Sequence, residues 1–308
     1  VSAVKTARRS TGKRAAALAL TAALVVGMTL PAFAETWFIE DGDISISAGT
    51  SGNHVEQGEK KQDETTETII TNRESTASSN TVTIEASEGK TVDVTLENVN
   101  IDTSKTGGAA VSVTGSGNTN LELNGNNTLT SGYGHAGLEH NKTDDSGTLT
   151  IQDEKNDDGS AKGGASDTTG SLTATGGYHG AGIGGSNEKD GQVTITGGEI
   201  TANGGSQGAG IGGGSGNKQA VGGDGDVTIS GGTITATGGS EDAYHSGGAG
   251  IGGGAFGNGT VIITDGDITA KSTGTFGAGI GGGASAKPKG TLIGGNGTVT
   301  ISGGTITE

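Results

Sequence analysis

The sequence contains no cysteine and two prolines, and aromatic residues make up 3% of its 308 residues. Without cysteine, no disulfide supports the chain outside the cell and no thiol nucleophile is available. Almost no proline and no G-X-Y period exclude collagen. So few aromatic residues cannot build a conventional globular core of this size. These absences favour a repetitive fold with a thin, evenly distributed core.

Basic residues are also scarce, with 18 Lys and Arg against 34 Asp and Glu. Five of the basic residues and none of the acidic ones lie in residues 1–34, so the remaining chain has 13 basic and 34 acidic residues, a net charge of −21. A surface of this charge repels nucleic acid and anionic lipid. We therefore expect no nucleic-acid partner.

One long hydrophobic run occurs, at residues 15–30. A basic segment precedes it and Ala32-Phe33-Ala34 comes after it, which is the organisation of a secretory signal peptide. The alternative is a membrane anchor, but 16 residues are short for a membrane span. We expect cleavage after Ala34 and a secreted, extracellular or cell-wall-associated mature chain without membrane insertion.

Glycine is abundant, with 65 residues, and much of it lies in a recurring string. GAGIGG stands at 180–185, and GAGIGGG at 208–214, 248–254 and 277–283. Each copy contains GxGxxG, but a nucleotide-binding loop requires a helix after it, and the segments after these copies, such as SNEKDGQVTI, have no helical pattern. Gly184 and Gly185 instead fit a corner that requires positive φ, with Ala181 and Ile183 pointing one way. The glycines are therefore interpreted as structural.

A second motif alternates with this string and consists of two short strands around a glycine turn. Its copies are VTITGGEITA (193–202), VTISGGTITA (227–236), VIITDGDITA (261–270) and VTISGGTITE (299–308). Degenerate copies are expected at 94–103 and at 37–46, where Ile39 and Ile44 would keep the register. The repeat would then begin almost at the mature N-terminus.

The underlying unit has about 28 residues, three short strands and a corner after each, which is one coil of a parallel β-solenoid. Residues 35–91 are interpreted as irregular N-terminal coils with a polar insertion, and 92–308 as regular coils with an insertion loop at 152–171. The final repeat is interrupted at 308, so we expect the solenoid to continue. Stacking predicts two inward ladders: Val193, Val227, Val261 and Val299, and Ile195, Ile229, Ile263 and Ile301.

Outward positions of the repeat strands are mostly threonine, a β-branched polar residue suited to an exposed strand. Ile262 interrupts one of these threonine ladders. The acidic residues are expected in the corners.

The stretch 92–132 resembles the carbohydrate-binding β-helix domain of secreted proteins from clostridia and related Gram-positive anaerobes. The tandem GAGIGGG and VTISGGTITATGG units are similar to Gram-positive surface repeats that often accompany that domain. The resemblance implies an all-β fold, a right-handed parallel β-helix of pectin-lyase type. It also implies binding of acidic plant polysaccharide with help from calcium.

Pectin-lyase-like folds include lyases and hydrolases, so catalysis has to be considered. A lyase of that type uses an Arg or Lys base beside an acidic calcium site, and the mature chain has one arginine, Arg73. A glycoside hydrolase needs two carboxylates across the substrate, and the repeat strands carry few acids. We therefore expect no enzyme activity.

Three Asp-Gly-Asp segments could supply oxygen ligands for calcium from corner loops. The alternative is that they are ordinary Asp-Gly turns. The histidines are too scattered for a zinc site. The candidate calcium ligands are Asp41, Asp43, Asp224, Asp226, Asp265 and Asp267.

Four of the seven aromatic residues of the mature chain fall in the same corner region, just before the glycine string: Tyr133, Tyr178, Tyr244 and Phe276. Stacked coils would bring them into a row along one edge, where flat rings could stack on sugars. They could equally cover the ends of the core.

Three functions are compatible with these features. The first is a secreted or cell-surface, non-catalytic carbohydrate-binding protein that recognises polysaccharide along an outer face or corner row. The second is a structural stalk or adhesin within a larger surface protein. The third is an ice- or crystal-binding threonine face.

Overall fold

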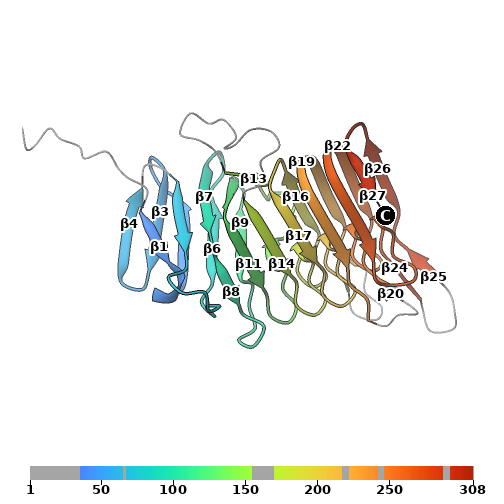
Figure 1. Ribbon diagram of the computed structural model, residues 1–308, viewed down its shortest axis with the longest axis horizontal. Coiled ribbons are helices and arrows are strands. Elements are labelled where there is room, and N and C mark those ends of the chain that lie inside the picture. The colour runs from blue at the N-terminus through green and yellow to red at the C-terminus, as the bar shows by residue number, and fades with distance from the viewer. Residues whose placement is uncertain are drawn as a thin grey trace, which may run out of the picture. The chain divides into compact units, whose positions relative to one another are not determined.

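The computed structural model describes residues 35–64, 67–154, 170–216, 222–241, 246–286 and 292–307. The predicted signal peptide, Tyr244 and most of the insertion loop 152–171 lie outside these residues. From Ala34 onward the chain forms one compact unit, in which the strands are stacked side by side in chain order (Figure 1).

The unit is built from three ladders of parallel strands. The first ladder contains β1 (Thr36–Phe38), β5 (Thr68–Thr71), β7 (Thr91–Glu97), β10 (Asn118–Asn124), β13 (Leu149–Asp153), β16 (Gly191–Ile195), the first parts of β19 (Gly225–Gly238) and β22 (Gly259–Ser272), and β26 (Gly297–Ile301). The second contains β8 (Asn100–Asp102), β11 (Asn126–Thr130), β14 (Ser171–Thr175), β17 (Glu199–Asn203), the second parts of β19 and β22, and β27 (Thr305–Thr307).

The third ladder contains β2 (Ile44–Ala48), β6 (Val82–Ala86), β9 (Val111–Gly115), β12 (Leu138–His140), β15 (Ile183–Gly184), β18 (Ile211–Gly212), β21 (Ile251–Gly252) and β23 (Ile280–Gly281). Two antiparallel strands extend it at one end, β3 (Asn53–Gln57) and β4 (Lys60–Glu64). A small antiparallel sheet is formed by β20 (Ser246–Gly247), β24 (Ala284–Ala286) and β25 (Leu292–Gly294). Among the described residues the helical content is one 3-10 turn, Ile39–Asp41.

Each regular coil contributes one strand to each ladder. Ile183 pairs with Ile211, which lies 28 residues later, and Val94 pairs with Leu121, which lies 27 residues later. The predicted all-β parallel β-helix with coils of about 28 residues is therefore confirmed.

The predicted inward ladders are confirmed as far as Val261 and Ile263; Val299 and Ile301 continue the pairing in register but are 39% and 49% exposed, so they do not lie in the core. Val193 pairs with Val227 and Val227 with Val261, while Ile229 pairs with both Ile195 and Ile263. These side chains are at most 1% exposed. Alternation along each strand places them inside, and parallel stacking brings each against its equivalent in the next coil. One continuous apolar core results.

The glycine string forms the third ladder and its corners. Ala181 and Ile183 are fully buried, as predicted. Gly184 has φ +124°, and a Cβ at this position would lie 2.2 Å from the carbonyl oxygen of Gly212 in the next coil. Only glycine fits this combination of backbone conformation and close approach. The expectation that Gly185 also has positive φ is wrong, because Gly184 alone makes the turn.

The N-terminal segment corrects another prediction. Residues 37–46 do not repeat the two-strand motif, because Ile39 lies in the 3-10 turn and Ile44 begins a strand of the third ladder, where it pairs with Val82. The antiparallel strands β3 and β4 then cover the outer edge of β2. The outermost strand, β4, has the sequence KKQDE, whose charges protect an exposed sheet edge against further pairing.

Candidate functional site

Tyr133 and Tyr178, called here the tyrosine pair, lie on neighbouring coils in the corner before β12 and β15. The backbone amide of Gly134 donates to the carbonyl oxygen of Tyr178 (2.9 Å), which sets the two turns in register. The ring centroids are 5.3 Å apart and the rings are nearly parallel, with an interplanar angle of 13°. Tyr133 is 67% exposed and Tyr178 40% exposed. The corner thus presents a stacked aromatic pair to solvent.

The inner ring of the pair is held by polar contacts. The Tyr178 hydroxyl donates to Oε1 of Glu241 (3.2 Å), and Nε2 of Gln207 donates to Oε2 of the same carboxylate (2.8 Å). The ring centroids of Tyr178 and His179 are also 4.1 Å apart, in an edge-to-face arrangement. Burial, and then the negative charge of Glu241, raise the pKa of Tyr178. Tyr178 is therefore a fixed support for the more exposed ring of Tyr133.

The other two aromatic candidates are not brought to this pair. Phe276 is 39% exposed and lies in the turn before β23. Gly277, the residue after it, is adjacent to Gly248 rather than to the turn of Tyr178. Tyr244 lies outside the described residues. The structure thus joins two of the four predicted residues.

The N-terminal pair of candidate calcium ligands is occupied by protein groups. Both carboxylate oxygens of Asp41 accept from the Arg73 guanidinium, at 2.5 and 2.7 Å, and this contact lowers the pKa of Asp41. Oδ1 of Asp43 accepts from the backbone amide of Thr81 (2.7 Å). The guanidinium carbon of Arg73 also lies 4.0 Å from the centre of the Phe38 ring. Arg73 is thereby tied to the N-terminal corner.

Asp224 and Asp226 lie where β19 begins, and each has a different protein partner. Oδ1 of Asp224 accepts from the backbone amide of Asn258 in the next coil (2.7 Å), and both of its oxygens contact the Asn258 amide nitrogen at 3.1 Å. Asp226 pairs with Lys142 at 2.7 Å. The same type of contact joins Asp224 to Asp190, whose carboxylate accepts the Asp224 amide. Asp190, Asp224 and Asn258 thus form a row of contacts that links neighbouring coils.

In the third segment, Oδ1 of Asp265 accepts from the backbone amide of Gly266 (2.8 Å), as in an ordinary Asp-Gly turn. Asp267 lies in β22, at an exposed outward position. Over the part of the chain that the structure describes, no three His, Asp or Glu side chains are grouped closely enough to hold a metal ion. Five of the six candidate aspartates thus make separate contacts within the protein, and Asp267 is exposed on its strand.

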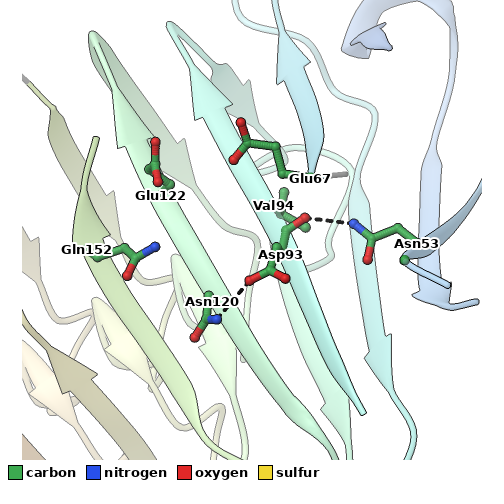
Figure 2. Close-up of a pocket in the computed structure, with 8 residues that line it drawn as sticks. Asn53, Glu67, Asp93, Val94, Asn120, Glu122 and Gln152 are labelled. Atoms are coloured by element: carbon green, nitrogen blue, oxygen red, sulfur yellow. Dashed lines mark hydrogen bonds between the residues drawn. The ribbon is translucent and has the colours of Figure 1, made fainter. Parts of the chain in front are cut away.

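A polar cleft of about 330 Å³ lies on the outer face of the first ladder. Figure 2 shows the side chains of neighbouring strands on one face, with Asn53 reaching toward them from β3. Asn53 donates to the carbonyl oxygen of Asp93 (2.7 Å), and Asn120 donates to Oδ1 of Asp93 (2.8 Å). The side chains that line the cleft are Asn53, Glu67, Asp93, Val94, Asn120, Glu122 and Gln152.

This cleft corrects the expectation that acids lie in corners. Asp93 is outward and exposed on β7, and Glu122 is outward on β10. Glu67 stands just before β5 and accepts from the hydroxyl of Thr95 (2.9 Å). The alternation in VDVTLE (92–97) and LELN (121–124) contained this signal, because the acids occupy the positions between buried apolar residues. Amides and carboxylates arranged in this way can form hydrogen bonds with ligand hydroxyl groups.

No helix among the described residues is long and apolar enough to cross a membrane.

The described geometry agrees with the family comparison. A family described as the β-helix repeat matches residues 170–187, 193–215, 227–255 and 261–284. Comparisons with curated proteins and with solved structures found no match. The four matched segments lie within the regular coils that carry the glycine string. The chain is therefore a protein with β-helix repeats whose fold is an all-β parallel β-helix.

Proposed function

We propose that this chain is a secreted or cell-surface, non-catalytic carbohydrate-binding β-helix protein. The observation that carries the proposal is the tyrosine pair, two parallel rings that stand in solvent at one corner. Large aromatic surface is seldom left exposed without a use, and a flat ring offers an apolar face with a polar edge. The apolar face of a pyranose ring is complementary to such a surface.

The alternative role, in which the rings cover the end of the core, agrees less well with the burial of the corner. Ala136 and Ala181, the core residues of the two turns, are fully buried. Tyr133 has two-thirds of its surface in solvent, so it contributes little to excluding water from the core. A role in binding sugars accounts for the exposure of the Tyr133 ring.

The placement of Arg73, the one arginine of the mature chain, supports the non-catalytic part of the proposal. Its guanidinium is engaged by Asp41 and lies over Phe38, so it would have to leave both to act as a base. We expect no unsaturated product and no new reducing ends from polygalacturonate, with or without calcium. Turnover that Arg73→Ala abolishes would contradict this part.

The main experiment compares glycan binding by the mature chain with binding by the double variant Tyr133→Ala/Tyr178→Ala. A glycan array with added calcium and with a chelator identifies ligands and tests whether calcium takes part. We expect the double variant to lose binding while its melting temperature stays close to that of the unmodified chain. Phe276→Ala is the matched control, since it removes an exposed ring from another coil.

Two outcomes would contradict the proposal. Loss of stability with retained binding would show that the rings serve the core. Absence of any glycan binding by the unmodified chain would favour a structural stalk or adhesin. Secretion is tested separately, by N-terminal sequencing of exported protein, for which we expect a start at Glu35.

A further inference from the structure

The orientation of the tyrosine rings limits how a sugar can contact them. The separation of their centroids, 5.3 Å, is close to the spacing of about 4.8 Å between neighbouring strands. The two residues occupy the same corner of neighbouring coils, so rings stacked at an angle of 13° follow the direction in which the coils stack. Each ring therefore lies roughly in the plane of its own coil. One face of the Tyr178 ring is covered by Tyr133, and the Tyr178 hydroxyl is bound by Glu241, a residue of a later coil.

The more exposed ring, Tyr133, has its second face turned toward the preceding coil. That coil runs beside it, because the amide of Gly132 donates to the carbonyl oxygen of Gly108 (2.8 Å). Gly107 and Gly108 carry no side chain, and a Cβ on either would meet nothing within 4 Å. The preceding turn thus places no side chain at these two positions, and Tyr133 is 67% exposed.

We propose that this second face of the Tyr133 ring binds a single uncharged pyranose ring, with the glycan crossing the corner in the plane of the coil. This inference rests on the proposed function and deepens it. A sugar stacked on this face lies in the plane of the coil, and equatorial glycosidic bonds leave a pyranose close to its own ring plane. A glycan that ran along the row of coils would instead have to displace Tyr133 from Tyr178.

The charges around the pair favour an uncharged sugar. The Glu241 carboxylate is bound to the Tyr178 hydroxyl, and Glu139, 7% exposed, lies at 2.8 Å from the His135 ring nitrogen. In the preceding corner, hydrogen bonds from Ser104, and to a smaller extent the positive charge of Lys105, lower the pKa of the Asp102 carboxyl. The chain without residues 1–34 has 13 basic and 34 acidic residues. A uronate would therefore meet a predominantly negative field around the tyrosine pair.

The experiment measures affinity by calorimetry and ligand-observed NMR with the mature chain. The probes are methyl glycosides of glucose, galactose, mannose and xylose, β-1,4-linked neutral oligomers of increasing length, and oligogalacturonates with and without CaCl2. With one stacked unit, affinity should change little as the neutral oligomer grows, whereas further stacked units would each raise it about tenfold. Oligogalacturonates should bind more weakly than neutral oligomers in both buffers.

Gly108→Leu is the most specific variant, because Gly108 lies in the turn beside that of Tyr133 and has space for a larger side chain. We expect it to weaken binding about tenfold, the scale of one stacking contact, with an unchanged melting temperature. Tyr133→Ala should have the same effect, and Gly108→Ala is the matched control.

The outcomes separate the two proposals. Failure of the unmodified chain to bind any probe would overturn the proposed function. Affinity that rises steeply with oligomer length, or that needs a uronate with CaCl2, would overturn the single neutral pyranose and leave the proposed function standing. If Tyr133→Ala and Gly108→Leu both leave binding unchanged, the glycan site does not lie at this corner.

Discussion

Replacing Ile229 with alanine tests the core ladder on which the fold depends. Ile229 is fully buried and pairs in register with Ile195 and Ile263. The substitution removes three carbon atoms, which at about 0.8 kcal/mol per methylene is about 2.4 kcal/mol of transfer free energy. The neighbouring side chains are fixed on adjacent strands and cannot easily fill the space, so a cavity term adds to this. We expect a total loss of about 3–4 kcal/mol in the free energy of unfolding.

Ile262→Ala is the matched control, because it makes the same substitution on the opposite face of the paired strand. Ile262 is 41% exposed and stands between Thr228 and Thr300 in an outward ladder. Its removal should change the free energy of unfolding by about 0.5 kcal/mol or less. Urea unfolding monitored by far-UV circular dichroism measures both variants, with equal m-values as the condition for comparison. Equal losses at the two positions would refute the ladder.

The corners and the core support three further predictions. Gly212→Ala should lower the free energy of unfolding, measured in urea, by about 2–5 kcal/mol, because φ is +129° and the new Cβ would lie 2.0 Å from the Gly252 carbonyl oxygen. Gly108→Ala should lower it much less. Equal losses in the two variants would contradict the close approach at Gly212. Burial lowers the pKa of His140 despite its contacts with two carbonyl oxygens. The unfolded chain therefore takes up the proton first, and stability from neutral His140 is lost as pH falls below about 6.5. Between pH 7.5 and 5, the melting temperature should decrease more steeply with falling pH for the unmodified chain than for His140→Gln. An equal pH dependence of the two melting temperatures would contradict this. Lys142→Met should change the free energy of unfolding by less than about 1 kcal/mol, because its pair with Asp226 is partly exposed; a larger loss in urea unfolding would contradict a surface pair.

The sequence alone determined the fold class and the register of the regular coils. Alternation of apolar and polar residues decides which side chains point inward, and equal spacing between repeats decides which residues become neighbours. Val193 and Val227 could therefore be assigned to one ladder from their spacing alone, and the two residues do pair. Gly184 was also predictable, because a string with no side chain beside an apolar residue fits only a tight corner.

Only the tertiary structure showed how the N-terminal segment pairs with the rest of the fold and which residues form the polar cleft. In residues 37–46 the local pattern matched the repeat, but Ile44 joins the third ladder because it pairs with Val82. The cleft combines Asn53 with Asp93, from parts of the chain that share no common repeat. Pairing of this kind depends on contacts between segments that are distant in the sequence, and the local alternation of apolar and polar residues does not reveal these contacts.

Both the sequence and the tertiary structure were needed to identify the tyrosine pair. The sequence placed Tyr133 and Tyr178 in the same corner of their coils, because each precedes the same alanine of the glycine string. It could not show that the rings stack on one another, or that Glu241 binds the Tyr178 hydroxyl. Side-chain orientation at an exposed corner is set by contacts with neighbouring coils. Those contacts exist only once the coils are stacked.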